Sequence, residues 1–238
     1  MRRGLPLLLF VLAAALPARA QPPQTVMDVA PTTLELQPDR AGLFFVTNHG
    51  ARPVTVQIEA MDWHPQDAAV GSPDRLTPST TLLTSPPMAR IAPGGRQSVR
   101  VLERGPAQGE RAFRLLVSQL PDAAGDGDGV RVLLQFSVPV FVGHDPHAVP
   151  QLRWALTDGM LTARNTGTQT VKLEGLRVNA VPRGALSYLL PGASLNLGPV
   201  TGGAHVRAHD GRSNRDILAD ISAPDASAPD AFVPDVRP

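Results

Sequence analysis

The stretch GVRVLLQFSVPVFV, residues 129–142, carries an apolar side chain at every second position. Side chains two positions apart on a β-strand point to the same face of the sheet, so these residues would share one face. They are Val130, Val132, Leu134, Phe136, Val138, Val140 and Val142. The pattern predicts a long strand that contains a proline, Pro139. Its apolar face covers either this protein's own core or a surface of another chain.

Shorter apolar runs with turn residues between them come before this stretch. They fall in residues 25–36, 43–47, 54–63, 98–102 and 112–120. The chain contains 25 prolines and 21 glycines, which interrupt it too often for long helices. About seven short strands separated by turns are typical of a β-sandwich of roughly 100 residues. We therefore predict an all-β fold whose first domain spans residues 21–142.

A second series of apolar runs follows residues 143–150 (GHDPHAVP), which are expected to form a linker. These runs fall in residues 152–156, 160–165, 171–178 and 188–197. The triplets Thr157-Asp158-Gly159 and Asn165-Thr166-Gly167 suit hairpin turns, because Asn, Asp and Gly tolerate positive φ. We predict a smaller second sandwich in residues 151–219. Ala, Pro and Asp dominate after it, so residues 220–238 are expected to form a disordered tail.

The beginning of the chain has the order of a secretory signal peptide. Arg2 and Arg3 precede an apolar run over residues 7–16, and Ala18-Arg19-Ala20 supplies the small residues of a cleavage site. The alternative is a short membrane anchor, but the run is well below the roughly 20 residues that cross a bilayer. We expect residues 1–20 to be removed and the exported, soluble chain to begin at Gln21.

The balance of charges argues against nucleic acid as a ligand. The chain has 22 basic and 21 acidic residues, a formal net charge of +1 and no long basic run. There are no cysteines, which excludes disulfides and thiolate metal sites. No apolar segment after the signal is long enough for membrane insertion. An exported chain without disulfides must rely on its core or on a partner for stability.

Histidine and aspartate clusters are the candidates for a metal or catalytic site. The histidine pairs are His144 with His147, in the proline-flanked linker, and His205 with His209, beside a glycine-rich turn. The loop 121–129 carries three aspartates but lacks the carboxylate that closes an EF-hand calcium loop. No phosphate-binding glycine loop, nucleophile elbow or HExxH helix occurs. We predict no metal site, no cofactor and no enzymatic activity; the enzymatic alternative is a metal-dependent hydrolase that uses these loops.

The landmarks of the first domain occur in the order found in a known protein family. They are LFFVTN at residues 43–48, a strand that ends in Trp63, PMARIAPGGRQSVR at residues 87–100, RLLVSQLP at residues 114–121 and SVPVFV at residues 137–142. The chain resembles the periplasmic pilus-assembly chaperones of the chaperone–usher pathway, the PapD-like family, and is most similar to the branch that serves archaic, spore-coat-type fimbriae. The resemblance covers residues 29–142 well and the second half more loosely, through WALTDGMLTARNTG and YLLPGA.

The resemblance implies two immunoglobulin-like β-sandwich domains set at an angle, with a binding cleft between them. It implies a periplasmic chaperone that holds pilus or fimbrial subunits lacking their last strand and passes them to an outer-membrane usher. Such a chaperone lends the last strand of its first domain to the subunit, which is a case of β-strand addition. In this chain the lent residues that fill the subunit's groove would be Val130, Val132, Leu134 and Phe136, with Val138 as a fifth candidate.

Two alternatives to that assignment follow from the same pattern. Either all the apolar side chains face this protein's own core, or residues 130–136 are lent to the subunit while Val140 and Val142 stay in the home core. Pro139 fits the edge of a sheet, since proline cannot donate a ladder hydrogen bond. Because an exposed apolar edge promotes aggregation, its presence in an exported protein favours a docking site for another chain.

Family members anchor the terminal carboxylate of the subunit with an arginine on the first strand and a lysine near the end of the lent strand. The corresponding positions here are Thr33 and Pro139, neither of which carries a charge. A guanidinium matches a carboxylate bidentately, so other arginines are candidates for this role. They are Arg90, Arg100, Arg114 and Arg131. A structural role explains Arg100 equally well, because it belongs to the family segment, and simple solvent exposure explains the others.

The structural alternative is a secreted immunoglobulin-like subunit or adhesin of a surface fibre. Such a subunit would have an N-terminal donor extension and an incomplete final strand, whereas the first domain here has a full set of predicted strands. The resemblance leaves open which subunit and which usher are the partners. It also leaves open whether the free chaperone caps its lent strand by forming a dimer.

Overall fold

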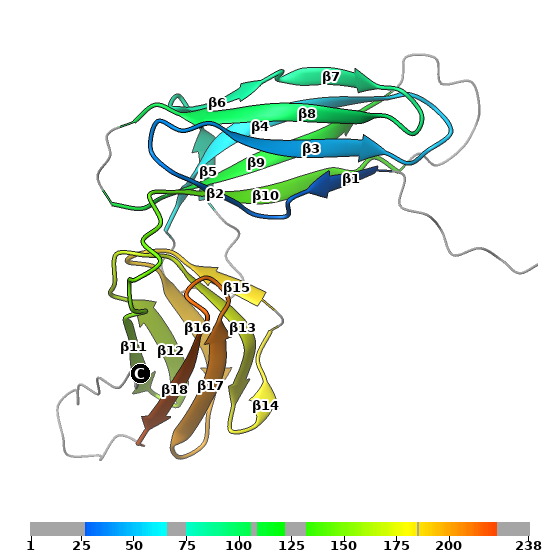
Figure 1. Cartoon of the computed structure of the whole chain (residues 1–238). Helices are drawn as coiled ribbons and strands as arrows, with labels where there is room; N and C mark the ends of the chain where they lie inside the picture. The colour runs from blue at the N-terminus through cyan, green and yellow to red at the C-terminus, as the bar shows by residue number, and fades with distance from the viewer. Residues whose placement is uncertain (1–26, 66–74, 106–108, 122–131, 185, 223–238) are drawn as a thin grey trace, which may run out of the picture.

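The computed structural model describes residues 27–65, 75–105, 109–121, 132–184 and 186–222. These residues form 18 β-strands and, within the described ranges, no helix. Figure 1 shows two β-sandwiches that are joined by the segment after β10 and lie at an angle to each other. The predicted all-β fold with two sandwiches is thereby confirmed. In the described part of the chain, no helix has the length and apolar character to span a membrane.

The first sandwich consists of two facing sheets. One sheet has the order β1-β3-β8-β6, and the other has the order β2-β10-β9-β4-β5, with β7 also paired to β4. The strands of the first sheet are β1 (Met27–Ala30), β3 (Gly42–Asn48), β8 (Arg96–Glu103) and β6 (Leu82–Ser85). Those of the second are β2 (Leu34–Leu36), β10 (Gln135–Val142), β9 (Arg111–Leu120), β4 (Val54–His64), β5 (Arg75–Pro78) and β7 (Met88–Ile91).

Alternating side chains from both sheets fill the interior of this sandwich. Those with no exposed surface include Phe44, Val46, Val56, Val99, Val101, Leu115 and Val117. On β9, for example, Phe113 and Leu115 point into this core while Arg114 between them lies on the opposite face of the sheet. The outer face of the sheet that contains β9 is therefore free to contact the second sandwich at one end.

The second sandwich is smaller and has the same layered construction. Its three-stranded sheet has the order β11-β12-β16, and the facing sheet has the order β14-β13-β17-β18, with β15 also paired to β13. The strands are β11 (Leu152–Thr157), β12 (Met160–Asn165), β16 (Ser194–Pro199), β13 (Val171–Val178), β14 (Val181–Pro182), β15 (Leu186–Leu189), β17 (Ala204–Asp210) and β18 (Arg215–Ile221). Residues 220 and 221 thus end β18, although their composition places them in the predicted tail.

The two predicted hairpin turns have different outcomes. Asp158 and Gly159 adopt positive φ and join β11 to β12, whose residues Thr157 and Met160 pair across the turn, as predicted. Asn165 does not form a hairpin, because β12 and the next strand, β13, belong to different sheets. Its buried side chain instead donates hydrogen bonds to the carbonyls of Gln169 and Leu189, at 2.8 Å each.

Asn48 plays the corresponding role in the first sandwich. Its fully buried amide donates to the carbonyls of Arg52, Ile91 and Ala92 at 2.8, 3.1 and 3.1 Å, and its Oδ1 accepts from the amide of Gly50. One side chain thereby ties the turn after β3 to the turn after β7. Satisfying these buried carbonyls is necessary because an unpaired polar group inside a protein costs roughly 1–3 kcal/mol.

Candidate functional site

Strand β10 is covered on one side along its whole length and on the other side only at its end. β9 pairs with all of Gln135–Val142, whereas β2 pairs only with Val140–Val142. Within the described ranges no other strand pairs with residues 135–139 on the side of β2. We call this uncovered side of residues 135–139 the open edge. In Figure 1, β10 lies at the lower side of the first sandwich, next to β2.

The direction of the main-chain groups at the open edge follows from one hydrogen bond. The Gln119 amide donates to the Leu134 carbonyl at an N–O distance of 2.8 Å. In an antiparallel pair the N–H and C=O of one residue point to the same neighbour, and this direction alternates along the strand. Even-numbered residues of β10 therefore bond to β9, while Gln135 and Ser137 turn their N–H and C=O outward. The next outward position is Pro139, which has no N–H to leave unpaired.

The exposure of the apolar side chains falls steadily along this stretch. Val132 is 75% exposed, and Leu134 and Phe136 are half-buried against the edge of the first sandwich's core. Val138 and Val140 are buried in that core, with 2% and 0% exposure. The single apolar face that the sequence pattern indicates is thus exposed at its beginning and internal at its end.

Two of the five candidate groove-filling residues are not exposed or half-buried side chains of the described chain. Val138 contributes to the protein's own core, in which its side chain is 2% exposed. Val130 lies outside the described residues. The remaining three are Val132, Leu134 and Phe136.

Arg114 is the candidate anchor that lies where the two sandwiches meet. It is the cross-strand partner of Pro139, and its Nη1 lies 3.5 Å from the hydroxyl of Ser137 on the outer face of β10. Its guanidinium carbon stacks 3.8 Å from the ring centre of Trp63 and 5.8 Å from that of Tyr188, a residue of the second sandwich. A cation over an aromatic face is attracted by the ring quadrupole, which holds the guanidinium in place.

Aromatic side chains around Arg114 form the apolar part of this junction. The ring centres of Trp63, Phe141 and Tyr188 are 5.6–6.1 Å apart in all three pairings. Thr33, at the position where an arginine was expected, lies with its hydroxyl 3.3 Å from that of Tyr188. The two positions at which a basic residue was expected, Thr33 and Pro139, thus both border the cluster that holds Arg114.

The other three candidate arginines lie elsewhere or are not described. Arg90 is exposed on β7. Arg100 is exposed on β8, which belongs to the other sheet of the first sandwich, so it faces away from the junction. Arg131 lies outside the described residues. Arg114 is the candidate for which the structure provides a position next to β10.

An ion-pair network, which local sequence patterns do not mark, connects the two sandwiches. Arg212, in the turn between β17 and β18, pairs with both oxygens of Glu35 at 2.9 Å and with Glu110 at 2.6 Å. Glu110 also accepts a hydrogen bond from the Thr170 amide at 2.7 Å. The guanidinium stacks on Phe141, 3.9 Å from its ring centre. These contacts join β2 and the residue before β9 to the second sandwich.

The charge of Arg212 is stabilised in spite of its burial. Removal from water disfavours the charged guanidinium, but the hydrogen bonds to Glu35 and Glu110 outweigh that effect and raise the pKa of Arg212. The side chains of Arg212 and Glu110 are 3% and 1% exposed, so neither charge has much access to water. A buried charge that lost its partner here would be strongly destabilising.

The histidine pairs have local partners in the second sandwich and the linker. His144 Nδ1 lies 3.1 Å from the side-chain oxygen of Gln169, and His209 Nδ1 lies 3.0 Å from Asp216. His205 pairs with Asp220. Among the described residues no group of three or more His, Asp or Glu side chains could hold a metal ion. The aspartate loop considered for calcium lies, apart from Pro121, outside the described residues.

Comparison with known proteins points to one family. The family model described as "Pili and flagellar-assembly chaperone, PapD N-terminal domain" matches residues 26–149. No curated protein matches the chain.

Similar solved structures agree on the fold. The CsuC–CsuE chaperone–tip adhesion subunit complex of archaic Csu pili from Acinetobacter baumannii includes a chain with a TM-score of 0.67 and 19% identity, covering 83% of this chain and 98% of that one. The Salmonella enterica complex of the SafA pilin and the SafB chaperone has a TM-score of 0.62 and 18% identity, and the match covers 82% of this chain and 96% of that one. The Escherichia coli chaperone DraB has a TM-score of 0.63 and 16% identity, and the match covers 82% of this chain and 96% of that one.

Proposed function

Because this chain belongs to the family of pilus and flagellar-assembly chaperones defined by the PapD N-terminal domain, we propose that it is a periplasmic chaperone for pilus or fimbrial subunits. It binds a subunit by donor-strand complementation and delivers it to an outer-membrane usher. The signal peptide predicted for residues 1–20 brings it to the periplasm. The function involves no catalytic step and no cofactor, and the free energy comes from folding of the subunit around the lent strand.

The observation that carries this proposal is the open edge of β10. Gln135 and Ser137 direct unpaired main-chain donors and acceptors outward, which is what an added strand requires. Beside them, Val132, Leu134 and Phe136 present apolar surface on one face. Covering that surface contributes about 25 cal/mol per Å² of apolar area. An unprotected edge of this kind is an aggregation hazard unless a partner covers it.

Arg114 is the residue that we propose as the carboxylate anchor. It lies across from Pro139, so its side chain reaches the place that a basic residue at position 139 would reach. Stacking on Trp63 holds the guanidinium in position. A subunit strand added to β10 and ending near Pro139 would bring its terminal carboxylate to this group, and a charge-assisted hydrogen bond is about twice as strong as a neutral one.

The class of partner is supported by two of the similar structures, which are complexes of a chaperone with a pilus subunit. The alternative, a fibre subunit or adhesin, predicts a first domain that lacks its final strand. Strand β10 occupies that position and pairs with β9 over all eight of its residues. The arrangement therefore favours a chain that donates a strand over one that receives it.

The proposal is tested by co-expressing the protein with a candidate subunit encoded near its gene and purifying the pair from the periplasm. In the variants Val132→Asp and Leu134→Asp, a carboxylate would enter the apolar groove of the subunit. Burying an unpaired charge is so costly that the amount of co-purified subunit should fall at least about tenfold. The matched control is Leu43→Asp, which adds the same charge at a 55% exposed position in the other sheet.

Circular dichroism and urea unfolding of the free variants separate the two readings of this strand. Retained stability with lost capture supports lending of the strand. Capture equal to that of the unchanged protein would show that Val132 and Leu134 do not contact the subunit. Loss of folding in the Leu134 variant would mean that this side chain serves the home core.

A further inference from the structure

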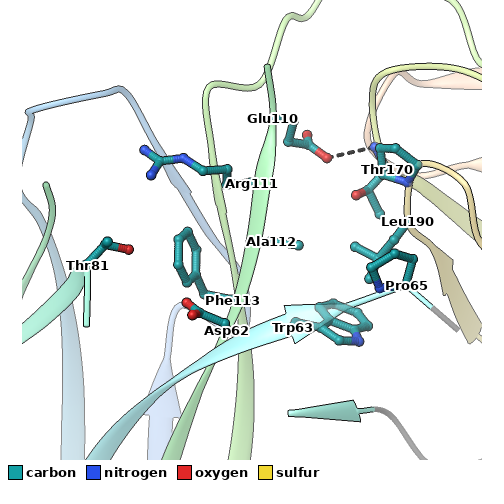
Figure 2. A pocket seen from close by; sticks show the side chains of 11 residues that line it. Asp62, Trp63, Pro65, Thr81, Glu110, Arg111, Ala112, Phe113, Thr170 and Leu190 are labelled. Carbon is teal, nitrogen blue, oxygen red and sulfur yellow. Dashed lines mark hydrogen bonds between the residues drawn. The ribbon is translucent and has the colours of Figure 1, made fainter. Parts of the chain in front are cut away.

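A pocket of about 400 Å³ lies between the two sandwiches, beside the ion-pair network and apart from the open edge. Figure 2 shows side chains from the end of β4 and the start of β9 on one side and Leu190 and Thr170 from the second sandwich on the other. Ligand pockets typically have volumes of about 300–1,000 Å³ and occur preferentially at domain interfaces. The size and the place of this pocket both fit a small-molecule or side-chain ligand.

The walls of the pocket are mainly apolar. Trp63, Phe113 and Leu190 are the largest apolar side chains of its lining, and Ala112 lies between them with a small side chain. Trp63 takes part in two sites, because it lines this pocket and also stacks against Arg114 in the junction. An aromatic or aliphatic body would be buried here by contacts with the rings.

The charged groups of the pocket leave one negative charge uncompensated. Glu110 is neutralised by Arg212, and Arg111 is neutralised by Glu103. Asp62, the remaining charged residue of the lining, has no ion-pair partner in the part of the chain that the structure describes. The net charge of the lining and its ion-pair partners therefore favours a cation.

The buried hydroxyl of Thr170 is a second polar group at this pocket that a ligand could pair with. Thr170 is 2% exposed, and its Oγ1 has no hydrogen-bond partner among the described residues. Figure 2 shows this hydroxyl on the side of the pocket where Ala112 lies. Buried polar atoms are generally satisfied by protein, water or ligand. A ligand with an N–H donor would supply a partner that the protein itself does not.

We propose that this pocket binds an amphipathic organic cation, with an ammonium or guanidinium group at Asp62 and an apolar body against Trp63, Phe113 and Leu190. The same chemistry is offered by a free arylalkyl amine and by a lysine or arginine side chain next to an aromatic residue in a peptide. Occupancy connects the first sandwich to the second through one molecule, since the lining comes from both.

Binding is measured by the fluorescence of Trp63 in a Trp154→Phe background, because these are the only two tryptophans of the chain. The probes are phenethylammonium and the blocked dipeptide acetyl-Phe-Lys-amide. The neutral isostere 2-phenylethanol is titrated against the same protein. We expect saturable changes with both cations and roughly tenfold weaker binding of the alcohol, because its hydroxyl lacks the positive charge that strengthens the hydrogen bond to the Asp62 carboxylate. Tighter binding of the dipeptide would identify a peptide source, and tighter binding of phenethylammonium a free amine.

Variants locate the binding at Asp62. The isosteric change Asp62→Asn should weaken both cations roughly tenfold and leave 2-phenylethanol unchanged. Glu59→Gln is the matched control, since it removes a carboxylate from the exposed part of the same strand, and it should have no effect. Ala112→Leu should abolish binding of all three probes by filling the space.

Two results would overturn the proposal. The first is equal affinity for phenethylammonium and 2-phenylethanol in the Trp154→Phe protein, a comparison that needs no change in the pocket. The second is unchanged cation binding in Asp62→Asn.

Discussion

At the scale of single residues, Arg114 combines a fixed guanidinium position with a place at the junction of the two sandwiches. Its guanidinium stacks on Trp63, and its neighbour across the strands is Pro139. From the sequence, Arg114 was one of four candidate arginines, because a pattern of alternation does not say on which face of which sheet a residue will lie. Only the packing of the two sandwiches distinguishes Arg114 from Arg90 and Arg100.

We expect Arg114→Met to weaken subunit binding about tenfold, since the apolar part of the stack remains while the charged partner of a carboxylate is removed. Titration calorimetry with a purified subunit, stabilised by a donor peptide that the chaperone displaces, would measure the change. Arg90→Met removes an equally positive side chain from an exposed position on β7 and should have no effect. Equal losses in both variants would indicate general charge attraction and contradict a specific anchor.

At the scale of elements, the alternation of apolar residues predicted some features of β10 and not others. The pattern predicted the strand and its single apolar face, because alternate side chains share a face whatever covers them. It could not predict where exposure ends and burial begins. Nor could it predict that β2, a strand of three residues that lies roughly a hundred positions earlier in the chain, covers only the end of β10. The sequence pattern made Val138 a fifth candidate for the lent residues, and in the structure its side chain packs in the home core.

The outward direction of Ser137 gives a prediction for this element. Ser137→Pro should remove an N–H that points to the subunit and leave the bonds to β9 intact, because those come from even-numbered residues. Loss of one hydrogen bond of about 1 kcal/mol corresponds to a roughly fivefold weaker complex, with little change in the stability of the free protein. Ser137→Ala loses the hydroxyl but keeps the N–H, so it should bind normally. Equal binding by both variants would mean that no strand is added at this position.

At the scale of the whole molecule, the angle between the sandwiches depends on contacts that no local pattern reveals. Glu35, Glu110 and Arg212 come from three distant parts of the chain and meet only after both sandwiches have formed. The aromatic cluster of Trp63, Phe141 and Tyr188 is assembled in the same way. Such long-range sets lie beyond the reach of motif and periodicity arguments, whereas the two sandwiches themselves follow from the strand patterns.

We expect Arg212→Met to lower the free energy of unfolding by roughly 3 kcal/mol, because it removes the guanidinium that pairs with the buried carboxylate of Glu110. Urea unfolding measures the stability, and small-angle scattering should show a more extended average shape. The double variant Glu110→Gln with Arg212→Met should recover part of the loss, as coupled partners do. Arg207→Met, at an exposed position on β17, is the control. A stability equal to that of the unchanged protein would show that the network does not hold the sandwiches together.

The short strand β2 has a consequence for what this protein can distinguish. It occupies the side of β10 from Val140 onward, so a strand that runs along the open edge reaches an obstacle at a defined residue. The main-chain groups of β10 before that obstacle can pair with an added strand whatever side chains the added strand carries. In the proposed function, β10 and β2 would together fix the length and register of an added strand with little regard to its sequence. A chaperone of this kind would therefore be able to bind several different subunits of one fibre.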